Sequence, residues 1–299
     1  MKNDLIYYTA LVIIKIVNAL PRTWALKLAG IAGEIWFIVG SRDRNIALRQ
    51  MRDVLGLTGD ELKGQARACF ETIIKNFVDV LRMGSWSEEY IGKVVEVEGY
   101  EHFLEAYNRG NGVIALTGHI GNFELIAAWF SVYKKHKCSV IGRELYDKRF
   151  DKMLLKQRTS FGLENIPSST SAMAFIRALK DGHAIGVLLD QDSKRVSGYF
   201  IDFFGKKALT AAGPIFIARK IGSPVVPMAI YRKNDDTYIL RILPELKFDW
   251  TDNKEDDIKG ALEKCNKATE QLIMYDPLQW VWFHNRWRTR PPSEKEMSA

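Results

Sequence analysis

The spacing of hydrophobic positions changes along the chain, and each spacing predicts a different kind of element. Apolar residues in 58–81 recur at intervals of three and four, which predicts a helix. After Gly84, short apolar runs alternate with helical patterns. The predicted strands lie at 94–99, 112–118, 138–142, 184–190, 223–231 and 237–243, and the predicted helices between them at 123–133, 150–161, 171–180 and 211–221.

This alternation predicts an α/β fold with a mostly parallel central sheet flanked by helices. Catalytic groups are then expected at the carboxyl ends of the strands. The sequence contains no internal repeat and no linker rich in Pro, Gly or Ser. We therefore expect one catalytic domain over residues 41–299, preceded by a helical segment over residues 1–40.

The N-terminal segment is the most apolar part of the chain. Lys15 and Asn18 interrupt its first run, residues 5–20, which is shorter than the roughly 20 apolar residues of a spanning helix. A basic cluster follows the second run, and such clusters favour the cytoplasmic side of a membrane. We expect membrane-associated helices that either span the bilayer or lie on it; two ordinary core helices are the alternative. The basic residues are Arg42, Arg44, Arg49 and Arg52.

Composition narrows the classes of partner and cofactor. The 299 residues are 47% hydrophobic and carry a net charge of +7, which excludes disorder and favours polyanionic partners: nucleic acid, anionic lipid or an acidic carrier. The chain has three widely spaced cysteines, Cys69, Cys138 and Cys265. Their number and spacing argue against a disulfide framework and against a structural zinc site, and they indicate a reducing compartment. Neither a P-loop nor a Gly-x-Gly-x-x-Gly motif occurs, so the sequence implies no nucleotide cofactor.

The sequence T-G-H-I-G-N-F-E, residues 117–124, follows the first strongly apolar strand. Asn122 can cap the following helix, and Glu124 can reach back to the imidazole of His119. A His–carboxylate pair lets the free ring nitrogen take a proton from a hydroxyl, without a serine or cysteine nucleophile. Amides near Gly121 can stabilise an oxyanion. The alternative is a strand-end histidine tied to an acid for stability alone.

Three further segments contain residues that could carry chemistry. Asp190, Gln191 and Asp192 end another apolar strand, where they can bind a cation, orient a basic side chain or simply be solvated. The aromatic, turn-rich segment 199–210 can form a hairpin. Arg143 follows the strand at 138–142 and can hold an anion.

Tryptophan and arginine interleave near the C-terminus, in residues 277–292. This composition is typical of a stacking surface for nucleic acid or of an aromatic belt at a membrane interface. No zinc finger or RNA-binding motif accompanies it. We therefore expect no nucleic-acid partner.

Taken together, the chain resembles the bacterial lipid A biosynthesis acyltransferases, within the glycerolipid and lysophospholipid acyltransferase superfamily. The resemblance covers R-D-R-N-I-A-L-R, G-H-I-G-N-F-E, L-D-Q-D, F-F-G-K-K-A-L-T, V-V-P and Q-W-V-W-F-H-N-R-W, in this order. The Glu-Gly-Thr-Arg block of the enzymes that acylate glycerol phosphate is absent, which argues against a simple glycerol phosphate acceptor.

The resemblance implies roles for particular residues. His119 and Glu124 would form the catalytic pair, and Arg143 would engage the acceptor phosphate or the acyl donor. Pro227 would match the proline of the last block. The substrate cleft would be lined by Gly121, Asn122, Asp190, Gln191, Asp192, Phe203, Phe204, Gly205 and Thr210.

It also implies an activity. A fatty acyl chain would pass from acyl carrier protein to a hydroxyl of a lipid A precursor, at the cytoplasmic face of the inner membrane and without a cofactor or metal. Another glycolipid or phospholipid acceptor, such as a phosphatidylinositol mannoside, is an alternative. Two readings from other classes remain open: a metal-dependent hydrolase with His119, Glu124, Asp190 and Asp192 as ligands, and a non-catalytic membrane-binding protein.

Overall fold

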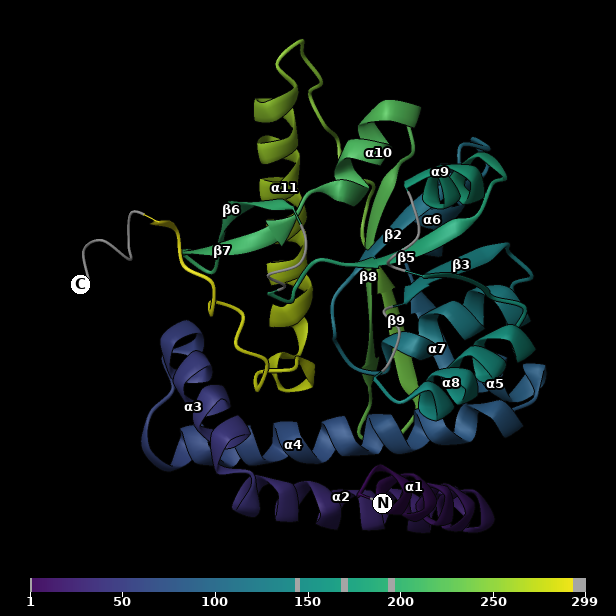
Figure 1. Cartoon of the computed structure of the whole chain (residues 1–299), viewed down its shortest axis with the longest axis vertical. Helices are drawn as coiled ribbons and strands as arrows, with labels where there is room; N and C mark the ends of the chain where they lie inside the picture. Colours follow the sequence, from purple (N-terminus) through teal and green to yellow (C-terminus); the bar gives the residue numbers. More distant parts are fainter. Residues whose placement is uncertain (1, 143–145, 168–171, 193–196, 293–299) are drawn as a thin grey trace.

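The centre of the fold is a seven-stranded sheet, seen in a computed structural model that describes residues 2–142, 146–167, 172–192 and 197–292 (Figure 1). Its strand order is β1-β9-β8-β2-β5-β3-β4. The strands are β1 (Val95–Glu98), β2 (Val113–Thr117), β3 (Cys138–Gly142), β4 (Glu164–Pro167), β5 (Ala184–Leu188), β8 (Val225–Arg232) and β9 (Tyr238–Ile242).

Strand direction follows from the connections. β8, β2, β5, β3 and β4 are parallel, while β9 runs antiparallel to β8 and β1 parallel to β9. Helices connect the parallel strands, as crossovers between parallel neighbours require, whereas a short turn connects β8 to β9. The predicted α/β class with a mostly parallel sheet is confirmed.

Helices cover both faces of the sheet, because buried parallel strands present apolar side chains on both sides. One face carries α5 (Glu88–Val94), α6 (Tyr100–Tyr107), α7 (Phe123–Ala128) with its π-helical continuation η2 (Trp129–Tyr133), and α8 (Lys148–Ser160). The other carries α9 (Ala172–Lys180), α10 (Gly213–Ile221) and part of α11 (Lys254–Tyr275). Alternate residues of β2 show the division, since Ala115 packs with the α7 side and Ile114 with the α10 side.

The N-terminal helices form a layer below one end of the sheet in Figure 1. The long α4 (Gly59–Arg82) lies nearest the strands, and α2 (Arg22–Val39) packs along it with α1 (Lys2–Ala19) beside it. α3 (Ser41–Leu55) follows after a bend of 90°. The hairpin of β6 (Gly198–Phe203) and β7 (Lys206–Ala211) packs against α11, and the short helices η1 (Met83–Ser85) and η3 (Pro277–Gln279) complete the elements.

A buried ionic cluster fastens this helical layer to the sheet. Asp79 of α4 is fully buried and receives hydrogen bonds from Arg22 of α2 and Arg232 of β8. The Tyr238 hydroxyl on β9 also donates to Asp79 at 2.6 Å. Burial alone raises a carboxyl pKa, but the two guanidinium groups and the phenol outweigh it, so the pKa of Asp79 is lowered.

The outer faces of α1 and α2 expose large apolar side chains. In the described chain, no single helix has the length and apolar character needed to cross a bilayer, although α2 and α3 pass that test together as a bent pair. Each of the following side chains has half or more of its surface exposed: Leu5, Ile6, Tyr8, Val12, Ile13, Ile16, Trp24, Leu28, Ile31, Ile35, Ile38 and Val39.

Candidate active site

A tight loop between β2 and α7 presents His119 at the carboxyl edge of the sheet. Gly121 makes this loop possible, because its φ is +58° and a Cβ there would lie 1.8 Å from the Ile230 carbonyl oxygen. The Gly121 N–H donates to the carbonyl of Gln279 at 2.9 Å, and Ile120 forms an isolated antiparallel bridge with Trp280. The C-terminal segment therefore holds the loop in place.

His119 is paired with Asp190. The sheet register explains why: Thr117 of β2 lies opposite Leu188 of β5, so the residues two positions beyond each strand also come together. The imidazole Nδ1 lies 2.8 Å from one carboxylate oxygen of Asp190, and the His119 backbone N–H donates to the other oxygen at 2.7 Å. Among the described residues, no hydrogen-bond partner of Nε2 is found.

The electrostatics of this pair favour an ionised acid. Asp190 is buried, which by itself raises a carboxyl pKa. The charge and hydrogen bonds of His119, with the Trp280 indole N–H at 2.8 Å, outweigh burial and lower the pKa of Asp190 to about 2. Because an ionised Asp190 accepts hydrogen bonds only, it fixes the proton on Nδ1 and leaves Nε2 free to accept one.

Glu124 has a different partner from the one the sequence analysis expects. Its carboxylate accepts two hydrogen bonds from the Arg158 guanidinium of α8, Nε to Oε2 at 3.1 Å and Nη2 to Oε1 at 2.5 Å. Gly142 leaves room for this guanidinium, since a Cβ there would lie 2.7 Å from Arg158 Nη1. The acid that fixes the imidazole is thus Asp190, while Glu124 and His119 share the wall of one cavity.

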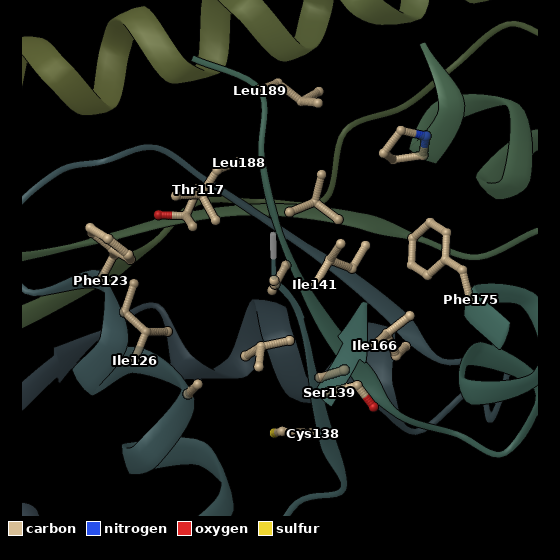
Figure 2. Close-up of a pocket in the computed structure, with 18 of the residues that line it drawn as sticks. Thr117, Phe123, Ile126, Cys138, Ser139, Ile141, Ile166, Phe175, Leu188 and Leu189 are labelled. Carbon is tan, nitrogen blue, oxygen red and sulfur yellow. The ribbon is translucent and has the colours of Figure 1, made fainter. Parts of the chain in front are cut away.

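That cavity has a volume of about 660 Å³ and mostly apolar walls (Figure 2). His119, Glu124 and Arg158 lie in its wall at the sheet edge. From there it passes between α7 and the strands β2, β5 and β3 as far as Cys138 and Phe130. It also reaches the opposite face of the sheet, where Phe175 and Ile217 line it. Such a cavity suits an apolar ligand.

Two groups in the loop are already occupied by intramolecular bonds. The Gly121 amide, expected as an oxyanion donor, is bonded to Gln279. Asn122 precedes α7 but makes no capping bond: its side chain is buried, its Nδ2 donates to the Tyr238 hydroxyl at 3.4 Å, and its Oδ1 has no partner among the described residues. Neither residue lines the described cavity.

Asp192 and Gln191 follow Asp190 but do not join it in a metal site. The Asp192 carboxylate accepts hydrogen bonds from the backbone N–H and the hydroxyl of Thr289, at 2.8 and 2.9 Å. The four residues of the hydrolase alternative are all described, and no group of three or more His, Cys, Asp or Glu side chains in the described ranges is arranged to hold a metal ion.

The remaining residues expected in the cleft lie in or beside the β6–β7 hairpin. Phe203 and Thr210 are fully buried, and the Thr210 hydroxyl accepts a hydrogen bond from Arg286 at 2.9 Å. Phe204 and Gly205 form the turn, with φ of +52° and +75°. None of the four is in the wall of the described cavity. Arg143 lies outside the described residues.

At its centre the C-terminal segment is neither an exposed aromatic belt nor a stacking surface, so both interpretations of its Trp/Arg composition are wrong there. Trp280, Trp282 and Arg286 are buried. Trp280 binds Asp190, while Arg286 donates to the carbonyl of Leu209 at 2.6 Å and thereby ties the hairpin to the site. His284 accepts the Asp192 N–H at 3.1 Å, and burial lowers its pKa.

Sequence reasoning missed the roles of Trp280, His284 and Arg158. Trp280 and His284 stand in the Q-W-V-W-F-H-N-R-W motif, so the motif itself was the available signal. Arg158 lies within a helix predicted from periodicity alone, and nothing in its sequence context distinguishes it from a surface arginine.

Fold and site together define a class: an α/β protein in which a carboxylate-oriented imidazole stands beside a large apolar cavity, as transfer chemistry on a lipid chain requires. Residues 2–289 match the family model of the bacterial lipid A biosynthesis acyltransferases, and the chain belongs to this family. It is accordingly an acyltransferase of lipid A biosynthesis type, and the resemblance of its motifs is confirmed.

Curated relatives agree with this assignment. The chain is 28% identical to the lipid A biosynthesis lauroyltransferase of Escherichia coli K12, over 91% of this chain and 94% of the relative. It is 26% identical to the lipid A biosynthesis palmitoleoyltransferase of the same organism, over 71% of this chain and 67% of the relative. It is 21% identical to the phosphatidylinositol mannoside acyltransferase of Mycolicibacterium smegmatis, over 74% of this chain and 71% of the relative.

Proposed function

We propose that this protein transfers a fatty acyl chain from acyl carrier protein to a hydroxyl of a lipid A precursor. The observation that carries the proposal is the position of His119, oriented by Asp190 in the wall of an apolar cavity. The relatives named as lipid A lauroyl- and palmitoleoyltransferases support the acceptor class. The cavity accommodates the acyl chain of the donor.

In this mechanism His119 Nε2 takes the proton of the acceptor hydroxyl as its oxygen attacks the thioester carbonyl carbon. A tetrahedral intermediate forms, and its collapse breaks the C–S bond. The imidazolium then returns the proton to the departing thiolate, so the products are the ester and the free thiol. Asp190 is the positioning residue, because its ionised carboxylate stabilises the imidazolium.

Arg158 and Glu124 supply the second half of the site. Two nitrogens of the Arg158 guanidinium are bonded to Glu124, and no partner for its Nη1 is found within the described ranges. We assign Nη1 the carbonyl oxygen of the thioester, where negative charge develops in the transition state. Glu124 holds that guanidinium in place, and Arg143 remains the proposed contact of an anionic group of donor or acceptor.

The N-terminal layer supports a location on the cytoplasmic face of the inner membrane. Apolar side chains such as Ile31 and Ile35 are more than half exposed on α2, and Arg49 and Arg52 of α3 are exposed as well. An apolar face beside basic residues binds anionic membrane surfaces. Replacement of Ile31 and Ile35 by serine should release the protein from anionic vesicles in a sedimentation assay, whereas persistent binding would contradict this location.

Helix α8 supports an acidic carrier as the donor. Its exposed Lys152 and Lys156 lie one turn apart on the same helix as Leu154 and Arg158, which line the cavity. Complementary charge steers association and is sensitive to salt. Lys152→Glu with Lys156→Glu should raise KM for an acyl carrier thioester and leave that for the corresponding coenzyme A thioester nearly unchanged. An equal change for both donors would argue against this docking surface.

The decisive experiment is mass spectrometry of products made by purified enzyme from an acyl carrier thioester and a lipid A precursor. His119→Ala should lower the rate by about 10²–10⁴-fold, as loss of a general base does. His102→Ala is the matched control, because that histidine is absent from the cavity wall. Wild-type rates in His119→Ala would overturn the mechanism. Transfer to a phosphatidylinositol mannoside alone would redirect the acceptor.

A further inference from the structure

At the centre of the sheet, the face covered by α7 carries unusually small residues. Gly186 is the middle residue of β5, between β2 and β3, where buried parallel strands normally carry large apolar residues. Its cross-strand neighbours are Ala115 and Val140. A Cβ added at Gly186 would meet no atom within 4 Å, because it would point into the cavity.

Accessibility along β5 and β3 traces the same channel. Gly186, Leu188 and Val140 are partly accessible although their strands are internal to the sheet. Beyond Gly186 the channel wall is formed by Ala184 and Cys138, which are paired in the register and buried. In Figure 2, Cys138 lies at one end of the lining side chains and Leu189 at the other.

The reactive group opens onto this face. The His119 ring packs edge-on against the Phe123 ring of α7, with the ring centroids 5.0 Å apart. The Glu124–Arg158 pair joins α7 to α8 on the same face of the sheet. On the opposite face the cavity wall is formed by side chains of a second hydrophobic cluster, among them Val187, Phe175 and Ile217. On the α7 face, an acyl chain whose thioester carbon lies at His119 has an open path along β5 past Gly186.

We propose that Gly186 is the position that sets the acyl-chain specificity of this enzyme, by leaving the channel open between His119 and Cys138. The proposal rests on the proposed function. Four residue steps from Leu188 to Ala184 span about 13 Å at the rise of a strand, which accommodates roughly ten carbons of an extended chain beyond the reacting carbonyl. The predicted donors thus carry chains of about 10 to 14 carbons.

The test is a graded series, Gly186→Ala, Gly186→Val and Gly186→Leu, given an equimolar mixture of decanoyl, lauroyl, myristoyl and palmitoyl carrier thioesters with a lipid A precursor. Each step should move the products to shorter chains. Gly186→Leu should raise the kcat/KM for the decanoyl donor relative to the myristoyl donor by at least about tenfold, since one methylene in an apolar pocket changes kcat/KM by roughly 10–200-fold.

Two further variants sharpen the result. Phe130→Ala, at the far end of the channel, should move the products to longer chains. Gly213→Val adds bulk to the cavity on the other face, where a Cβ also meets no atom within 4 Å. A chain-length shift in Gly213→Val without one in Gly186→Leu would overturn the proposal and place the chain on the α10 side.

Controls distinguish a failure of the Gly186 specificity role from a failure of the proposed acyl-transfer function. Gly64→Val on the exposed surface of α4 is the matched glycine substitution and should keep the wild-type product profile. Failure of the wild type to acylate any acceptor would remove the proposed function itself. An active wild type whose profile stays unchanged in Gly186→Ala, Gly186→Val and Phe130→Ala would overturn the specificity role alone, even with Gly186→Leu unfolded.

Discussion

The Trp280 indole N–H donates a hydrogen bond of 2.8 Å to the Asp190 carboxylate, whose other oxygen accepts from His119 Nδ1. A residue near the end of the described chain thus fixes the acid that orients the imidazole. Because Asp190 is buried, each of these hydrogen bonds replaces one that water would otherwise supply. The charge state of Asp190 is therefore set by two partners that a substitution can remove separately.

Asp190→Asn should lower kcat by roughly 10²–10⁴-fold, because an amide neither fixes the Nδ1 tautomer nor stabilises the imidazolium. Unlike a merely structural defect, the loss should come with an altered pH profile of kcat and partial rescue in Asp190→Glu. Asp181→Asn, at the exposed turn before β5, is the control. A pH profile that stays unchanged would argue against a positioning role.

The same carboxylate predicts an acid-dependent stability. Its folded pKa of about 2 lies below the unfolded value near 4, so Asp190 contributes stability that is present above about pH 4. That contribution should be lost as the pH falls from about 4 to 2. Urea unfolding at pH 7 and pH 3 should therefore show a steeper acid loss in the wild type than in Asp190→Asn. Equal losses would contradict the shifted pKa.

Trp280→Phe removes one donor to Asp190 and keeps most of the aromatic volume. We expect kcat to fall by about 10- to 100-fold with KM little changed, because one charge-assisted hydrogen bond is worth about 1.5–3 kcal/mol. Trp282→Phe is the matched control, since its indole N–H donates to the Pro277 carbonyl at 2.6 Å instead. Equal effects of the two substitutions on kcat would point to packing alone.

The Glu124–Arg158 pair should respond asymmetrically to substitution. Arg158→Gln removes the group assigned to the thioester carbonyl and should lower kcat by about 10²-fold. Glu124→Gln should lower kcat less, because Arg158 is still present and loses only part of the hydrogen bonding that holds its guanidinium in place. If Glu124→Gln instead matches His119→Ala in steady-state assays, Glu124 is itself the essential acid of the reaction.

Asp79→Asn should destabilise the fold without touching the site. A buried acid shared by Arg22 and Arg232 leaves unpaired charge when it is removed, at a cost of about 3–5 kcal/mol. Chemical denaturation would measure the loss. Asp60→Asn on the same helix is the control, because its side chain is fully exposed and surface substitutions change stability by about 0.5 kcal/mol or less.

The sequence was most informative for the internal strands of the sheet. The runs that became β2, β3 and β5 were predicted within two residues, because parallel strands covered by helices on both faces are mostly apolar. β4 was missed, since an edge strand of sequence E-N-I-P carries little apolar signal. α11 was also missed, because one side packs on two cores and polar residues separate its apolar positions.

The site shows a different limit. His119 and the Asp190 cluster were both recognised as strand-end groups, but their pairing depends on β2 and β5 being neighbours in the sheet. Periodicity identifies strands without giving their order, so the nearer acid in sequence, Glu124, was assigned instead. The Arg158 contact to Glu124 spans 34 positions and has no local signal at all.

The bridge between Ile120 and Trp280 also bears on how the enzyme is made. During synthesis the segment that carries His119 leaves the ribosome long before the indole that secures its acid. A growing chain can complete β2 and β5 and still lack the hydrogen bond at Asp190. Nascent or truncated polypeptides ending before Trp280 should therefore react with acyl donors more slowly than the full-length chain.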